Sequence, residues 1–170
     1  MSELRIAGTV GESITDGPGF RFTIFTQGCP HHCEGCHNPQ THDFGGGEVV
    51  STDTLWDKIS KNPLLSGVTL SGGEPFEQAG ALIPLAEKIK AAGLELAAYS
   101  GWTVEELISQ GGDMLELLKK CDVLVDGRFK LAEKSLMLRF RGSKNQRLLD
   151  VKKTLETGVA TEVHDGRWQD

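Results

Sequence analysis

Four cysteines are the residues of this chain best suited to chemistry, and three of them fall within eight positions. Cys29, Cys33 and Cys36 have the spacing Cys-x3-Cys-x2-Cys, whereas Cys121 stands far downstream. Thiolates are the ligands that zinc and iron–sulfur clusters prefer. A disulfide framework would instead spread its cysteines along a much shorter, secreted chain. The spacing therefore predicts that Cys29, Cys33 and Cys36 hold a metal or a cluster.

The residues alone leave two kinds of metal site open. A structural zinc ion needs a fourth ligand, which would here be one of four nearby histidines: His31, His32, His37 and His42. A cubane cluster held by three cysteines leaves one iron free to bind a substrate or cofactor. Because no second pair of closely spaced cysteines follows, we favour the cluster. Three of the histidines (His31, His32 and His42) are otherwise expected to be exposed loop residues, and Cys121 a small buried one.

The segments around the cysteines alternate between strand-like and helix-like patterns. Strands are predicted at 4–10, 20–26, 67–71, 94–99 and 121–126. Helices are predicted from residue 51 onward, between 77 and 93, after a capping box at 103–106, and around 115–118. Such alternation is typical of βαβ units on a parallel sheet, so the fold class is α/β. The 170 residues are too few for a complete eight-fold barrel, which needs ~250, but allow a partial one.

Four unusual segments follow predicted strands directly. They are the cysteine loop, Gly72–Pro75, Ser100-Gly101 and Asp126-Gly127. Ligands of parallel α/β sheets sit at the carboxyl ends of the strands. We therefore expect these four segments to meet at one edge of the sheet.

Composition restricts the classes of partner. The formal net charge of −6 argues against direct nucleic-acid binding by electrostatics. No apolar run approaches the ~18 residues of a membrane span, and the N-terminus lacks a secretory apolar region, so we expect a cytoplasmic protein without membrane contact. Residues 1–156 are predicted to form one domain. The tail, 157–170, has no periodicity and is expected to be loosely ordered or to dock on the rest.

The cysteine spacing after an early strand resembles the radical-SAM superfamily. A second signature of that superfamily, the GGE motif, is matched by Ser71-Gly72-Gly73-Glu74-Pro75 after the following strand. The resemblance implies a partial (β/α) barrel with a mostly parallel sheet and an open side. It also implies a 4Fe–4S cluster on three cysteines, with S-adenosylmethionine bound to the open iron.

The same resemblance assigns further cofactor contacts. It implies that Gly72, Gly73 and Glu74 meet the methionyl end of S-adenosylmethionine. It places other contacts beside the sulfonium and adenine at Gly35, Cys36 and His37, and further ones at Ser100 and Asp126. Many superfamily members carry an aromatic residue where Gly35 stands. Adenine contact would then depend on the backbone and on neighbours such as His37.

Four shorter stretches resemble the activating enzymes of glycyl-radical proteins. They are 16–21 (DGPGFR), 36–39 (CHNP), 125–129 (VDGRF) and 141–146 (RGSKNQ), the last resembling the activators of anaerobic ribonucleotide reductase. The resemblance implies an oxidoreductase that takes an electron from a small donor such as a flavodoxin or ferredoxin. The enzyme would cleave S-adenosylmethionine and generate a glycyl radical on the large partner.

Two other functions remain open at this stage. One is a radical-SAM enzyme that acts on another glycyl-radical enzyme or on a small molecule, such as a short ring-contracting enzyme of deazapurine synthesis. The other is a zinc-binding interaction module. A late basic cluster is either a docking or phosphate-facing patch or an ordinary solvated face: Arg139, Arg141, Lys144 and Arg147.

Overall fold

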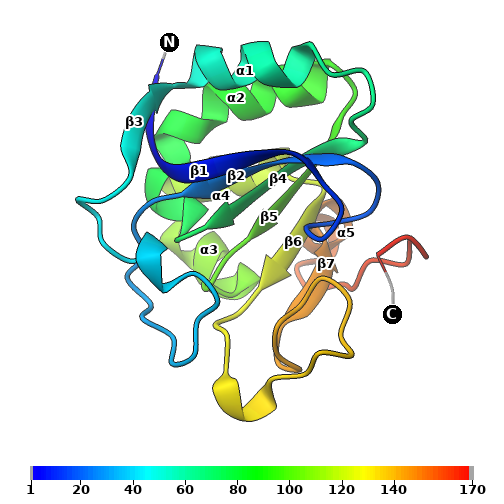
Figure 1. Cartoon of the computed structure of the whole chain (residues 1–170). Coiled ribbons are helices and arrows are strands. Elements are labelled where there is room, and N and C mark those ends of the chain that lie inside the picture. The colour runs from blue at the N-terminus through cyan, green and yellow to red at the C-terminus, as the bar shows by residue number, and fades with distance from the viewer. Residues whose placement is uncertain (1, 169–170) are drawn as a thin grey trace.

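A single mixed sheet organises the chain in this computed structural model, which describes residues 2–168 (Figure 1). Its strands are β1 (Glu3–Ser13), β2 (Arg21–Thr26), β3 (Glu48–Ser51), β4 (Gly67–Gly72), β5 (Glu95–Tyr99), β6 (Val123–Asp126) and β7 (Arg147–Asp150). Their order in the sheet is β3-β1-β2-β4-β5-β6-β7. The four central strands β2, β4, β5 and β6 run parallel to one another. The prediction of a mostly parallel sheet is confirmed, with antiparallel strands at both edges.

The helices follow the strands as the alternation predicts. They are α1 (Thr52–Ser60), α2 (Ala79–Ala91), α3 (Val104–Gln110), α4 (Gly112–Lys120) and α5 (Val151–Thr157), with 3-10 turns at Pro39–Thr41, Pro75–Gln78 and Leu131–Glu133. The expected capping box is present at α3, where the Thr103 hydroxyl accepts from the Glu106 amide. The proline turn of the GGE segment delays α2 to Ala79, two residues after the expected start.

The two edge strands β3 and β7 and helix α5 were not predicted. β3 has only four residues, none of them buried, so it carries no alternation of apolar and polar side chains. β7 is also four residues long, and its two inner positions are both leucines. Strands this short become recognisable only through their neighbours, because β1 and β6 supply the pairing.

The sheet has an apolar layer on each face. On one face the strands pack against all five helices, through residues such as Leu70, Leu96 and Leu124. On the other face a smaller cluster consists of Ala97, Val123, Val125, Leu148, Val163 and Trp168. The last two belong to the predicted tail, so described tail residues cover the sheet face that lacks helices. No helix within residues 2–168 is long and apolar enough to cross a membrane.

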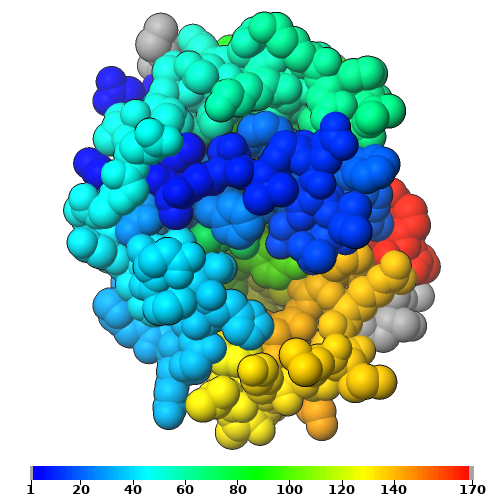
Figure 2. All heavy atoms as spheres, viewed as in Figure 1, coloured from blue at the N-terminus to red at the C-terminus, as the bar shows by residue number. Residues whose placement is uncertain are grey.

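Two long loops extend from the carboxyl ends of the parallel strands. One, residues 27–47, follows β2 and carries the three clustered cysteines; the other, residues 127–146, follows β6 (Figure 1). Figure 2 shows a hollow between these loops, bordered by the blue to cyan N-terminal region and the yellow to orange later loop. The expected convergence at this sheet edge therefore forms a real cavity.

Candidate active site

The cavity at the carboxyl edge measures about 690 Å³. Small-molecule sites typically fall between roughly 300 and 1,000 Å³. Its lining includes seven of the predicted site residues: Cys29, Cys33, Cys36, His37, Gly72, Gly73 and Ser100. Gly35, Glu74 and Asp126 are not part of the lining. The structure thus brings together residues from the cysteine loop, from the end of β4 and from the end of β5.

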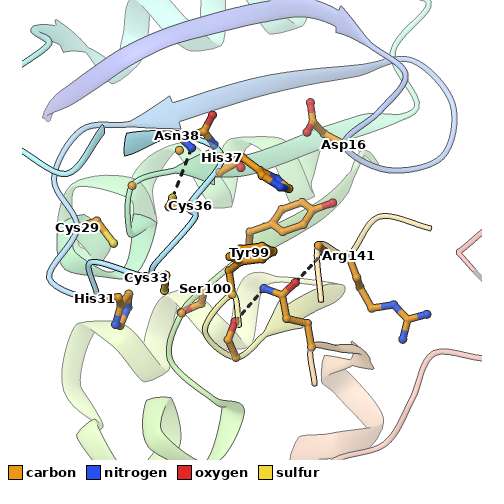
Figure 3. Close-up of a pocket in the computed structure, with 18 of the residues that line it drawn as sticks. Asp16, Cys29, His31, Cys33, Cys36, His37, Asn38, Tyr99, Ser100 and Arg141 are labelled. Atoms are coloured by element: carbon orange, nitrogen blue, oxygen red, sulfur yellow. Dashed lines mark hydrogen bonds between the residues drawn. The ribbon is translucent and has the colours of Figure 1, made fainter. Parts of the chain in front are cut away.

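The three loop cysteines are free thiols that surround one end of the cavity (Figure 3). Burial raises the pKa of Cys29 to about 11 and also raises the pKa of Cys33. The Cys36 sulfur accepts a hydrogen bond from the Asn38 amide at 3.4 Å. Because metal ligation requires thiolates, binding at Cys29 and Cys33 must displace their protons.

These thiols do not converge as ligands of one ion do. Within residues 2–168, no three His, Cys, Asp or Glu side chains are grouped so that they could hold a single metal ion. Ligands of one zinc ion would lie about 2.0–2.3 Å from a common point. Thiols that face the same space without meeting at one point fit an iron–sulfur cluster, whose cysteines bind different irons.

Gly72 and Gly73 pack directly against the start of the cysteine loop. A side chain on Gly72, whose φ is +96°, would lie 2.4 Å from the Thr26 amide nitrogen. A side chain on Gly73 would lie 2.4 Å from the Gly28 carbonyl oxygen, and Glu74 donates its amide to that same oxygen. Here the close approach that requires glycine is to the chain's own backbone. Gly72 therefore fixes the end of β4 against the end of β2, and Gly73 fixes the following residue against Gly28, which precedes Cys29.

The Glu74 carboxylate lies behind the cavity wall and is fully buried. It accepts hydrogen bonds from His31 Nε2 at 2.7 Å, Ser100 Oγ at 2.9 Å, the Gly101 amide at 2.8 Å and the Phe76 amide at 3.1 Å. These donors come from the cysteine loop and from the segment after β5. In this structure Glu74 therefore joins the loop to the sheet, with no surface on the cavity.

His31 is not the exposed loop residue that the sequence suggested, since its side chain is only 3% exposed. Its Nε2–H donates to Glu74, and its Nδ1 accepts from Arg128 Nε at 3.3 Å. The ring also meets Trp102 edge-on, with the centroids 4.7 Å apart. The histidine is buried because the carboxylate satisfies its N–H, a pairing that no sequence spacing reveals.

Comparison with known proteins now adds to this geometry. Residues 15–149 match the family model described as a 4Fe-4S single cluster domain. Curated relatives named anaerobic ribonucleoside-triphosphate reductase-activating protein are 34% identical in Vibrio cholerae and 31% in Haemophilus influenzae, each alignment covering 78% of this chain and 89% of the relative. The relative from Enterobacteria phage T4 is 33% identical over 79% of this chain and 86% of its own length.

The chain belongs to this family of activating proteins. The family match to a 4Fe-4S domain also argues against the zinc module. Among solved structures, QueE from Escherichia coli has the same fold, with a TM-score of 0.50 and 18% identity, covering 73% of this chain and 71% of that one. The predicted α/β architecture with a mostly parallel, open sheet is thereby confirmed.

In this family member Asp126 is a buried structural residue. Its carboxylate accepts from the Val104 amide at 2.8 Å, at the start of α3, and from Arg147 Nη2 at 2.6 Å. Arg147 also pairs with Glu105 at 2.6 Å, which lowers the pKa of that carboxyl. The charge of Arg147 is thus paired with these two carboxylates. Arg147 therefore does not add free positive charge to the basic cluster predicted from the sequence.

Sequence reasoning missed several residues that line the cavity of this activating protein. They are Asp16, Tyr99, Phe129, Phe140, Gly142 and Gln146, among others. Asp16, Phe129, Gly142 and Gln146 belong to stretches that carried the family resemblance, so the signal was present without an assigned role. Tyr99 had no such signal, because only the register of β5 turns it toward the cavity.

Phe129 supplies an aromatic ring beside the cysteine loop. Its ring lies 5.0 Å from that of His37, and a side chain on Gly35 would come within 3.4 Å of it. Gly35 has φ +72°, and its missing side chain leaves room for Leu131. An aromatic ring from the loop after β6 therefore lies next to position 35, which has no aromatic side chain of its own.

Proposed function

We propose that this protein is a radical-SAM activating enzyme that generates a glycyl radical on an anaerobic ribonucleotide reductase. The observation that carries the proposal is that three free cysteines face one cavity at the carboxyl edge of the sheet. The names of the relatives support the choice of partner, and the 4Fe-4S family model supports the cofactor.

Cys29, Cys33 and Cys36 are the residues that would hold the 4Fe–4S cluster, leaving one iron for S-adenosylmethionine. With S-adenosylmethionine bound, the cluster would supply one electron for its reductive cleavage to methionine and a 5′-deoxyadenosyl radical. That radical would take a hydrogen atom from a glycine Cα of the partner, which gives 5′-deoxyadenosine and the glycyl radical. The electron comes from a small donor of the flavodoxin or ferredoxin type. The chain contributes binding, orientation and exclusion of water.

The residues around the cysteines would divide the binding of S-adenosylmethionine. The backbone of Gly72 and Gly73 borders the cavity and suits the polar methionyl end. Ser100 stands beside it, although its hydroxyl already donates to Glu74. His37 and Phe129 offer adjacent aromatic rings, which suit an adenine face.

Glu74 would act here as a positioning residue. Its hydrogen bonds to His31 and to Ser100-Gly101 join the cysteine loop to the end of β5. A ligand held between these two segments needs their separation to stay constant, because small misplacements slow a reaction strongly.

The direct test is an anaerobic assay of the protein after reconstitution with iron and sulfide. S-Adenosylmethionine cleavage is measured after reduction, with and without the anaerobic ribonucleotide reductase of the same organism. Low-temperature EPR then monitors the glycyl radical. We expect a glycyl doublet only when both proteins are present.

Two other results would change the proposal in different ways. Cleavage without a radical on the reductase would retain the chemistry and point to another protein or a small molecule as substrate. A colourless, zinc-loaded protein that cleaves nothing would overturn the assignment altogether. Replacing the chemical reductant by a reduced flavodoxin or ferredoxin tests the donor in the same assay.

A further inference from the structure

The loop after β6 carries an apolar tip at the mouth of the cavity. Within it, Lys134 and Ser143 form an antiparallel bridge, and the Ser135 amide donates to the Gly142 carbonyl at 3.2 Å. Residues Lys134–Ser143 thus form a projection, here called the mouth hairpin. Its tip residues Leu136 and Met137 are 88% and 89% exposed. Single exposed apolar residues are ordinary, but two adjacent ones this exposed form a contact point.

The mouth hairpin lies in the most basic part of the chain. Residues 128–147 contain one acidic residue, Glu133, and seven basic ones: Arg128, Lys130, Lys134, Arg139, Arg141, Lys144 and Arg147. The whole chain nevertheless carries a net charge of −6. Positive charge is therefore concentrated in one segment of an otherwise acidic protein, which favours an acidic partner at that place.

Part of this positive charge is not neutralised by the protein itself. Arg147 is paired with Asp126 and Glu105. Lys134 and Lys144 are exposed, and neither forms an ion pair within the described part of the chain. These two lysines flank the apolar tip in sequence and remain available to a partner.

The hairpin also borders the route into the active-site cavity. Leu136 and Leu138 belong to the cavity lining, as do Thr15 and Asp16 of the N-terminal loop. The neighbouring Ile14 is itself 68% exposed. The mouth hairpin therefore stands beside the cavity, and Figure 2 shows the hollow that separates this yellow to orange loop from the N-terminal region.

We propose that the mouth hairpin is the docking surface for the glycyl-radical partner, an inference that rests on the proposed function. The complementary surface would be acidic with an apolar centre, and would lie beside the extended glycine-bearing segment that enters the cavity. The apolar tip would supply most of the contact energy, because a methionine adapts its shape to a partner surface. The lysines would steer the encounter.

The test uses the cluster-loaded protein and the anaerobic ribonucleotide reductase of the same organism. Met137→Glu removes the exposed apolar contact, and Lys134→Glu reverses a flanking charge. The matched controls are Val159→Glu, at another exposed apolar residue, and Lys152→Glu on α5. Anaerobic binding affinity, its salt dependence and reductase-independent S-adenosylmethionine cleavage are measured for each variant.

We expect Met137→Glu to weaken binding of the reductase about tenfold or more, as loss of a central contact does. Lys134→Glu should weaken binding by roughly threefold to tenfold at low salt and make it less dependent on salt. The two control variants should bind within about twofold of the unaltered protein, as surface changes outside an interface do. Reductase-independent cleavage should be unchanged in all four.

Reductase affinities of Met137→Glu and Lys134→Glu equal to those of the controls would overturn the docking proposal. Binding of the unaltered protein to vesicles of phosphatidylserine and phosphatidylcholine, lost in Met137→Glu while reductase affinity stays constant, would identify the hairpin as a membrane contact instead. Failure of the proposed function itself is distinguishable, because the unaltered protein would then form no glycyl radical on the reductase.

Discussion

The cysteine loop and the end of α4 use the same residue type in opposite ways. Cys29, Cys33 and Cys36 face a cavity from a loop held to the sheet by a few polar contacts. Cys121 instead lies in the main apolar core, where its thiol donates to the Leu117 carbonyl at 3.5 Å. The pKa of Cys121 is raised by burial to about 12.

The difference teaches what determines the role of a thiol in this fold. Burial alone does not separate the two regions, because Cys29 is only 8% exposed and Cys121 4%. What separates them is the number of thiols around one space: three loop thiols border one cavity, whereas Cys121 stands as a single cysteine between the main apolar core and a second hollow at the end of α4. An iron–sulfur cluster needs several thiolates around one space, which the loop supplies and a single buried thiol does not.

The largest effect is expected when the thiols are removed one at a time, which tests whether the loop thiols and Cys121 have different roles. Cys29→Ala, Cys33→Ala or Cys36→Ala should each abolish cluster binding, because a cluster with two protein ligands is not retained. Cys121→Ala should leave it intact. Iron and sulfide analysis after anaerobic reconstitution measures the outcome, and a normal iron content in Cys33→Ala would disprove the ligand assignment.

A smaller effect is expected at the carboxylate that anchors the loop. Glu74→Ala leaves four buried donors without their acceptor: His31 Nε2, Ser100 Oγ and the amides of Gly101 and Phe76. We expect the free energy of unfolding of the cluster-free protein to fall by about 2–4 kcal/mol. Urea unfolding measures it.

The matched control for Glu74 is the exposed Glu77, three residues later. Glu77→Ala should change the free energy of unfolding by less than about 0.5 kcal/mol. His31→Ala removes the contact between Glu74 and the loop, together with the ring's contacts to Arg128 and Trp102, and leaves the other three donors to Glu74 in place. It should therefore lower stability less than Glu74→Ala does, while still lowering cluster retention. Equal stability of Glu74→Ala and Glu77→Ala would contradict the anchoring role.

The smallest expected effect is the pH dependence of stability that the buried Cys121 thiol causes. An unfolded thiol ionises near pH 9, whereas the folded Cys121 keeps its proton until about pH 12. As pH rises through this interval, ionisation of the thiol stabilises the unfolded state, so the free energy of unfolding falls. Relative to Cys121→Ala, the unaltered protein should lose about 1 kcal/mol of stability between pH 9 and pH 10.

Urea unfolding of both proteins at pH 8, 9 and 10, under reducing conditions, gives this difference directly. The three loop cysteines are present in both proteins, so the comparison isolates Cys121. Parallel stability curves would show that the Cys121 thiol ionises as easily in the folded state as in the unfolded one.

The sequence predicted the central strands, the capping box of α3 and the place where the cysteines meet the other strand ends. It could do so because these features depend on local pattern and on the direction of parallel strands. It could not predict that Glu74 turns away from the cavity. That orientation results from the backbone packing of Gly73 on Gly28 and from the donors around the carboxylate.

The burial of His31 and the pairing of Asp126 with Arg147 escaped prediction for the same reason. Each joins residues far apart in the chain, His31 with Glu74 and Asp126 with Arg147. Local sequence reports that such side chains are polar, but it does not report which distant partner satisfies them. The edge strand β7 likewise becomes visible only beside β6.

The packing of Trp168 has a consequence for the order of events during biosynthesis. This side chain is fully buried, lies under the Arg21 guanidinium at 5.3 Å and meets the Phe140 ring at the same distance. The face of the sheet next to the cavity is therefore closed by residues that leave the ribosome after all the others described. A chain truncated before Trp168 would leave Arg21 and Phe140 without this packing partner.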